Sequence, residues 1–274
     1  VHLWGRPCDI DSLTDIARRH RLVLMFDAAH AFACSHAGRL LGGFGDAEVF
    51  SFHATKFFNS FEGGAVTTND DALAEKIRLM RNFGFAGYDE VVYLGTNGKM
   101  SEISAAMGLT SLESMDEFIS VNRRNYELYR AQLADVPGLR IIEYNQTERN
   151  NFQYIVVEKD RAATALERDD VVDILWAENV IARRYFYPGC HRMEPYRTLD
   201  PGAGLTLPVT EELAARVLLL PNGTAVDEQE ILEVCSVIRL VMARAEEVKA
   251  RLARVALAQS AQEVMVARGV AKEH

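Results

Sequence analysis

The sequence is poor in cysteine, in long apolar runs and in surplus positive charge. Four cysteines are scattered over 274 residues without C-x-x-C spacing, which indicates neither a zinc site nor a disulfide framework. No apolar run approaches the roughly 20 residues that a membrane-spanning helix needs. A net charge of −9 argues against nucleic-acid binding, which requires a clustered basic surface. We therefore predict reduced thiols, a cytoplasmic location, and no metal, membrane or nucleic-acid partner.

The composition is that of a folded globular protein. With 49% hydrophobic and 25% charged residues, the chain can bury a large core. We predict part of a large domain over residues 1–135, ending in a long helix from about 101 to 134, a smaller α/β domain over 136–244, and a helical extension over 245–274. Apolar residues spaced by three and four between 231 and 255 predict one continuous helix, whose stripe either packs on its own domain or mediates assembly.

Shorter patterns predict the remaining elements. Apolar periodicity and turn residues give helices over 9–20, 70–83 and 170–179, and strands over 21–27, 47–52, 65–68, 152–157 and 180–186.

Three polar side chains follow the first two of these strands. Residues 21–27 read as a buried parallel strand that ends in Asp27, and residues 47–52 bring Ser51 and then Lys56 to the same sheet edge. Ligands of open α/β sheets bind at that edge. Each residue also has an ordinary explanation, since lysines are mostly solvated, aspartates often cap turns, and a serine can be a small core residue.

Together these residues suit pyridoxal phosphate (PLP). A lysine forms a Schiff base with the cofactor and then moves a proton, provided that burial lowers its pKa. An aspartate keeps the pyridine nitrogen protonated, so that the ring can accept electrons. The hydroxyl of Ser51 can donate to the phosphate, and the small residues Ala28 and Ala29 let a flat ring approach the backbone.

Four separated motifs carry a resemblance to a known family. Asp-Ala-Ala-His-Ala at 27–31, Ser-Phe-His-Ala-Thr-Lys at 51–56, Glu-Gly-Gly-Ala at 62–65 and Thr-Asn-Gly-Lys-Met-Ser-Glu at 96–102 resemble the DegT/DnrJ/EryC1/StrS aminotransferases, from about residue 1 to 241. The resemblance implies the α/β PLP-dependent transferase fold type I, with a mixed, mostly parallel sheet in the large domain and a smaller C-terminal α/β domain. Members mostly aminate keto sugars attached to nucleotides.

The resemblance also assigns roles to residues. It implies Lys56 and Asp27 as catalytic residues, and a cofactor site formed by Lys56, Asp27, Ala29, His30, Ser51 and Asn97. Asn97 would reach the cofactor phosphate of the opposite subunit, in a homodimer with shared active sites. Lys99 departs from the arginine usual at its position. Tyr185, Tyr187 and His191 resemble the substrate-facing segment, although an aromatic core edge with a proline turn explains them equally well.

Family members carry about a hundred residues or more before the point that matches Val1. Two interpretations follow, a piece of a longer protein or a shortened homologue that no longer binds PLP. The first is favoured because residues 1–5 look like the end of a buried strand. The predicted function is amino transfer, with glutamate as the usual donor, to a nucleotide-linked keto sugar such as a 4-keto-6-deoxyhexose. The alternatives are an aminotransferase for a cyclitol and a PLP-free scaffold or partner subunit.

Overall fold

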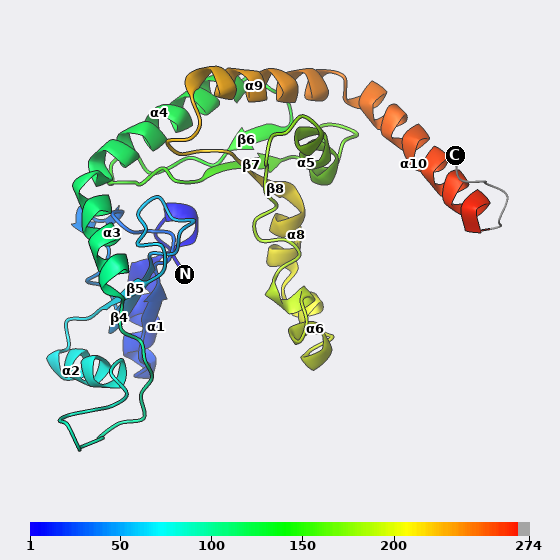
Figure 1. Ribbon diagram of the computed structural model, residues 1–274. Coiled ribbons are helices and arrows are strands. Elements are labelled where there is room, and N and C mark those ends of the chain that lie inside the picture. Colours follow the sequence, from blue (N-terminus) through cyan, green and yellow to red (C-terminus); the bar gives the residue numbers. More distant parts are fainter. Residues whose placement is uncertain (268–274) are drawn as a thin grey trace. The chain divides into compact units, whose positions relative to one another are not determined.

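The computed structural model describes residues 1–267 and divides the chain into two compact units (Figure 1). The first unit comprises Val1–Tyr126, Glu143–Tyr154 and Asn222–Ala225. The second comprises Glu127–Ile142, Ile155–Pro221 and the described chain from Val226 onward. The division into domains at residues 135 and 244, which the sequence predicts, stays a prediction. None of the described helices has the length and apolar character needed to span a bilayer.

The first unit is built on a three-stranded sheet. Its elements are η1 (Leu3–Gly5), α1 (Ile10–His20), β1 (Met25–Asp27), β2 (Ser35–His36), β3 (Arg39–Leu40), β4 (Ala47–Ser51), β5 (Gly64–Thr67), α2 (Asp71–Met80), α3 (Glu102–Glu113) and the first part of α4 (Met115–Leu133). The sheet order is β1-β4-β5, with β1 and β4 parallel and β4 and β5 antiparallel. Strands β2 and β3 form a separate hairpin.

Both early helices start at aspartate caps. The side chain of Asp9 accepts from the Ser12 backbone N–H at 3.0 Å, and Asp70 accepts from the first N–H groups of α2. An acidic first turn and a basic last turn in α1 match the helix dipole. The predicted helices are therefore present, and α1 ends where Arg21 turns left-handed, at a φ of 53°.

The first predicted strand is shorter and more exposed than expected. Only Met25–Asp27 pairs with β4, and its residues alternate exposed, buried, exposed. Met25 keeps 65% of its surface accessible because β1 is an edge strand with one neighbour in the described sheet. The prediction of a parallel strand ending in Asp27 was right, and the prediction that this strand is buried was wrong. Residues 3–5 form the 3-10 turn η1, where the end of a buried strand was expected.

A buried polar pair lies inside the first unit beside an apolar core that includes Ile10, Phe26 and Phe50. His2 and Glu48 are both fully buried. The Cys8 N–H donates to His2 Nδ1 at 3.2 Å, so His2 Nε2 carries the proton that Glu48 Oε1 accepts at 3.3 Å. The other Glu48 oxygen accepts from the backbone N–H groups of Gly42 and Phe44. The His2 N–H donates to the carbonyl of Asp27 at 2.8 Å, which ties this pair to β1.

We expect Glu48→Gln to destabilise the first unit by about 3 kcal/mol, because an amide cannot accept all of these hydrogen bonds and leaves buried donors unpaired. Burial by itself would raise the pKa of Glu48, but the hydrogen bonds from His2, Phe44 and Gly42 outweigh it, so the pKa lies below the usual value of a glutamate. The stabilisation is thus present above the pKa of an unfolded glutamate and is lost as the pH falls through the lowered pKa of the folded protein. Urea unfolding at pH 7 and at pH 4 measures both effects, and the difference between wild type and variant should shrink at the lower pH.

The matched control is Glu75→Gln, because Glu75 is exposed and, among the described residues, forms an ion pair with Arg78 across the α2 surface, at 3.5 Å. It should change stability by less than about 0.5 kcal/mol. Equal unfolding midpoints for the two variants would contradict the role assigned to Glu48.

The second unit is built on an antiparallel sheet of order β6-β7-β8. Its elements are the end of α4, β6 (Leu139–Ile141), β7 (Ile155–Lys159), α5 (Arg168–Ala177), η2 (Cys190–Arg192), α6 (Tyr196–Leu199), α7 (Ala203–Thr206), α8 (Pro208–Arg216), β8 (Val217–Leu220), α9 (Glu228–Ala243) and α10 (Ala245–Ala267). The predicted strand over 180–186 is absent, since β8 pairs with β7 and only Arg183 bridges to Leu219.

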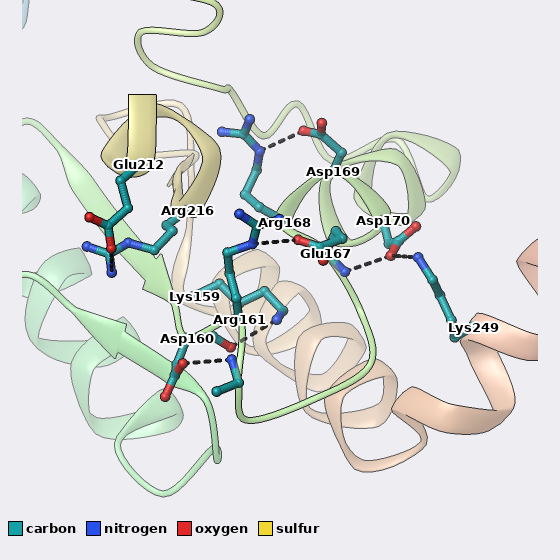
Figure 2. Close-up of polar contacts among 11 residues, drawn as sticks. Lys159, Asp160, Arg161, Glu167, Arg168, Asp169, Asp170, Glu212, Arg216 and Lys249 are labelled. Carbon is teal, nitrogen blue, oxygen red and sulfur yellow. Dashed lines mark hydrogen bonds and ion pairs between the residues drawn. The ribbon is translucent and has the colours of Figure 1, made fainter. Parts of the chain in front are cut away.

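Each of the two predicted long helices is broken once. Ser114 separates α3 from α4, and Arg244 separates α9 from α10, both with backbone angles that end the first helix. Within the second unit, Lys249 of α10 donates to Asp170 at 2.7 Å, and the same carboxylate closes the capping box of α5 (Figure 2). The start of the extension is therefore attached to α5, while residues 268–274 of the predicted extension lie outside the described residues.

Candidate active site

Two strand ends bring Asp27 and Ser51 to one edge of the first sheet. Asp27 lies opposite Val49 in the parallel pair, and Ser51 follows two residues further toward the same edge. The Ala28 N–H donates to the Val49 carbonyl at 2.8 Å, so the pairing continues into the loop after Asp27. The Asp27 carboxylate accepts from the Ala29 N–H at 3.0 Å, which orients it.

Lys56 lies in a closed loop after β4. Its N–H donates to the His53 carbonyl at 2.9 Å, and its own carbonyl accepts from Asn59 Nδ2 at 3.3 Å. The loop returns to the strand where the Ser60 N–H donates to the Phe52 carbonyl at 2.9 Å. These bonds present a half-buried Lys56 side chain.

Lys56, Asp27 and His30 form one electrostatic group. Burial lowers the pKa of Lys56, and the nearby Asp27 carboxylate partly offsets this effect. Burial likewise lowers the pKa of His30 to about 4, the Lys56 cation adds to the shift, and Asp27 opposes it. The sequence-predicted lysine, aspartate and histidine are therefore close enough to influence each other, and His30 is neutral at neutral pH.

Trp4 and Tyr154 hold the His30 ring in place. The Trp4 N–H approaches His30 Nδ1 at 3.3 Å, which makes Nδ1 the acceptor and assigns the proton of the neutral ring to Nε2. The ring packs on Tyr154 with 4.6 Å between centroids. Trp4 adopts a left-handed backbone, at a φ of 56°, and its indole nitrogen is buried without a hydrogen bond in the described structure.

Asn97 lies in an exposed loop whose contacts are local. It bridges to Asn82, and its side-chain oxygen accepts from Lys99 Nζ at 2.7 Å. Lys99, the residue that departs from the family pattern, also lies over the Phe83 ring at 4.4 Å. Gly84 and Gly95 permit the loop's close backbone approach, since a Cβ at Gly95 would lie 2.4 Å from the Gly84 nitrogen.

The three predicted substrate residues belong to the second unit. The Tyr187 ring lies under the Arg168 guanidinium at 5.0 Å, and Tyr185 packs on Phe186. Arg168 is itself buried and bonded to Asp169 at 2.6 Å (Figure 2). His191 Nε2 lies 2.5 Å from Glu211, whose pKa is lowered to about 2 by hydrogen bonds from Arg192 and His191.

Sequence reasoning missed the amide side chains around the lysine. Gln153 Nε2 donates to the Thr55 carbonyl at 2.9 Å, immediately before Lys56. A cavity of about 300 Å³ in the first unit is lined by Lys56, Asn59, Gln153 and Asn222, among others. The polar run Asn-Asn-Phe-Gln at 150–153 was the available signal, but it was absorbed into the predicted strand 152–157.

Comparisons with known proteins find relatives along most of the chain. The DegT/DnrJ/EryC1/StrS aminotransferase family model matches residues 1–239. A dTDP-4-amino-4,6-dideoxy-D-glucose transaminase of Shigella dysenteriae is 38% identical over 241 residues, which are 87% of this chain and 64% of that protein. A GDP-perosamine synthase of Caulobacter vibrioides is 35% identical over 235 residues, 84% of this chain and 62% of that protein.

A solved structure extends the likeness to three dimensions. DesI, crystallised in the presence of its TDP-sugar product, matches with a TM-score of 0.85 and 53% identity, over 91% of this chain and 63% of that one. The chain thus spans a little under two thirds of the length of these relatives. The predicted fold is confirmed as the α/β fold of PLP-dependent sugar aminotransferases, fold type I. By sequence and by fold, this chain belongs to the DegT/DnrJ/EryC1/StrS aminotransferase family.

Proposed function

We propose that this protein is a PLP-dependent aminotransferase that moves an amino group from an amino acid, with glutamate as the donor, to a nucleotide-linked keto sugar. The observation that carries the proposal is the half-buried Lys56, with its lowered pKa, beside Asp27 and His30 at one sheet edge. Membership of an aminotransferase family supports the reaction class. The four cysteines are free, which fits the cytoplasm as the proposed location.

The residues present fit the proposed cofactor. An amine that burial shifts toward its neutral form suits covalent capture of an aldehyde. A carboxylate held by the Ala29 N–H suits a protonated ring nitrogen, and the neutral His30 can lie against an aromatic ring without adding charge. Ser51 would contribute to phosphate binding from the same edge, with Ala29 beside the ring. When bound, PLP supplies an aldehyde that captures amines and a ring that accepts electrons from the substrate carbon.

The chain's own residues then act at defined atoms. Lys56 Nζ would hold the cofactor between reactions and, as a neutral amine, would take up and return the proton of the donor's α-carbon. The Asp27 carboxylate would pair with a protonated ring nitrogen in both halves of the reaction. The two halves run in opposite directions over the same groups, so one lysine serves both.

Relatives' names support the substrate class. The two curated relatives are named as enzymes of dTDP-linked and GDP-linked sugars. We therefore propose a nucleotide-linked keto sugar, with a 4-keto-6-deoxyhexose as the specific candidate. Tyr185, Tyr187 and His191 remain its proposed contacts. A cyclitol acceptor is the alternative within the same chemistry.

A direct experiment separates an enzyme from a PLP-free scaffold or partner subunit. The purified protein, incubated with PLP, should show a visible absorption band that borohydride abolishes, and mass spectrometry should place the reduced cofactor on Lys56. A protein that gains neither the band nor the modified lysine would instead be the scaffold.

We also propose a homodimer in which Asn97 enters the partner's site. Twelve large apolar side chains between Met80 and Leu112 are exposed, and two of them, Tyr88 and Leu94, keep more than nine tenths of their surface accessible, at 101% and 94%. An exposed apolar surface of this extent is typical of an interface. A two-fold dimer would then contain two equivalent shared sites.

Mixing variants tests the shared site. A heterodimer of a Lys56→Ala subunit and an Asn97→Ala subunit should regain up to half of the wild-type activity, because one of its two sites then contains both residues. A heterodimer of Lys56→Ala with Asp27→Asn is the control and should regain none, since those residues act from one chain. If verified Lys56→Ala/Asn97→Ala heterodimers stay inactive while Asn97→Ala alone is impaired, the shared-site proposal is wrong.

A further inference from the structure

A short segment, Asn151, Phe152 and Gln153, connects the two loops of the candidate site. Asn151 is fully buried, and its Nδ2 donates to the carbonyls of His30 at 2.9 Å and Phe32 at 3.1 Å. Its Oδ1 accepts from the Gln153 N–H at 3.1 Å. Gln153 in turn donates to the Thr55 carbonyl at 2.9 Å. One continuous set of hydrogen bonds therefore joins the His30 loop, residues 28–33, to the Lys56 loop, residues 52–60.

The backbone of this segment is strained in its middle. Phe152 adopts a left-handed conformation, at a φ of 50°, which a bulky residue rarely takes. Its buried ring packs against Tyr144 at 4.8 Å and Tyr126 at 5.4 Å. Such strain persists where the surroundings over-determine the backbone, and it concentrates at functional sites. Here it turns the side chains of Asn151 and Gln153 toward different loops.

A second layer of amides fixes the segment from behind. Asn222 Nδ2 donates to the carbonyls of Phe152 at 2.7 Å and Gln153 at 3.1 Å. Asn125 donates to Asn222 Oδ1 at 3.0 Å, and Asn122 donates to the Asn151 carbonyl at 3.1 Å. Asn122 and Asn125 are buried, so water does not compete for these bonds.

The two side chains that reach the site loops, those of Asn151 and Gln153, are neutral amides, whereas the charged Arg124 bonds to Asn125 at 2.9 Å, further from Lys56 along the network. Neutrality matters next to a lysine whose charge state decides its chemistry. Asp27 is the one charged group that acts on the pKa of Lys56 among the described residues. A charged connector at position 153 would shift that pKa, whereas an amide restrains the loop without doing so. The cavity of about 300 Å³ beside Lys56 leaves the loop room to move if the restraint is removed.

We propose that Gln153 and Asn151 are positioning residues that hold the Lys56 loop in register with the His30 loop, and that Asn222 supports them. Their meaning for catalysis rests on the proposed function, but the positioning itself does not, since it concerns the place of Lys56 in the protein. Removing the hydrogen-bond donor of Gln153 should therefore change the reactivity of the Lys56 side chain, whether or not the cofactor is bound.

The test is the reactivity of Lys56 in the purified, PLP-free protein. Gln153→Met keeps the side-chain volume and removes the donor. Pulse labelling with acetic anhydride between pH 6 and 11, read by peptide mass spectrometry, gives the labelling midpoint of Lys56. We expect the midpoint to rise by about 0.5 pH unit or more, because the freed loop becomes better solvated. Hydrogen exchange of the amides at 53–60 should accelerate by about tenfold or more.

Asn69→Ala is the matched control, because Asn69 also donates an amide hydrogen bond to a distant carbonyl, that of Gly43 at 3.2 Å. It should leave both readouts at wild-type values. Asn222→Ala loosens the same segment without changing Gln153, and it should shift the labelling midpoint of Lys56 in the same direction. This second variant tests the proposal if Gln153→Met does not fold. Wild-type labelling midpoints and exchange rates in a folded Gln153→Met variant would overturn the proposal. Failure of PLP to bind Lys56 in wild type would instead count against the proposed function alone.

Discussion

We expect Lys56→Ala to reduce amino transfer by at least about 10⁴-fold while the protein stays folded. Lys56 is proposed both to hold the cofactor and to move the proton, and removal of a positioned acid-base group by itself costs about 10² to 10⁴ in rate. The loss of the covalent attachment adds to that cost. Because the side chain is only half-buried at the edge of a cavity, its truncation leaves the core intact. Initial rates at saturating PLP, together with a thermal unfolding curve, measure both effects.

Lys76→Ala is the control for this variant. Lys76 is an exposed residue of α2 that lies over the Tyr93 ring at 5.4 Å, and its removal should leave the rate within about twofold of wild type. A Lys56→Ala protein that transaminates at close to the wild-type rate would remove Lys56 from the mechanism.

We expect Asp27→Asn to bind PLP but to react about 10² to 10³ times more slowly, the usual cost of removing one preorganised charge or dipole from a reacting centre. The amide oxygen can still accept from the Ala29 N–H, so the local backbone is preserved. The pKa of Lys56 should fall further, since the Asp27 carboxylate is the group that raises it. Single-turnover rates and the Lys56 labelling curve are the two measurements.

Asp46→Asn provides a closely matched control, because Asp46 lies just before β4, at the opposite end of the β1–β4 pair from Asp27. Asp46 also accepts a backbone hydrogen bond, from Leu24 at 2.7 Å, but it does not act on the pKa of Lys56 or His30. It should leave the single-turnover rate and the Lys56 pKa unchanged. If Asp27→Asn lowers thermal stability but leaves the rate per folded molecule unchanged, Asp27 is a structural cap and has no role in the chemistry.

The elements that sequence reasoning predicted well are those with local causes. Helices α1 and α2 carry their own caps and charge patterns, and β4 is an apolar run bounded by turn residues, so each was found to within a few residues. The predictions that were wrong depend on neighbours. The segment 180–186 has strand composition, but in the fold it meets the edge strand β8 only at the Arg183–Leu219 bridge. The breaks at Ser114 and Arg244 likewise have no proline or glycine to mark them.

The sequence by itself determined the family and the proposed chemical groups, because Lys56, Asp27, His30 and Ser51 lie in short motifs whose spacing is readable along the chain. Only the tertiary structure decided which distant side chains hold those groups. Gln153 is 98 positions from Thr55 and Asn151 is 121 positions from His30, and amides at such separations leave no periodic pattern. Their partners are backbone carbonyls, which every residue possesses, so the pairing depends on the folded path of the chain and not on residue identity.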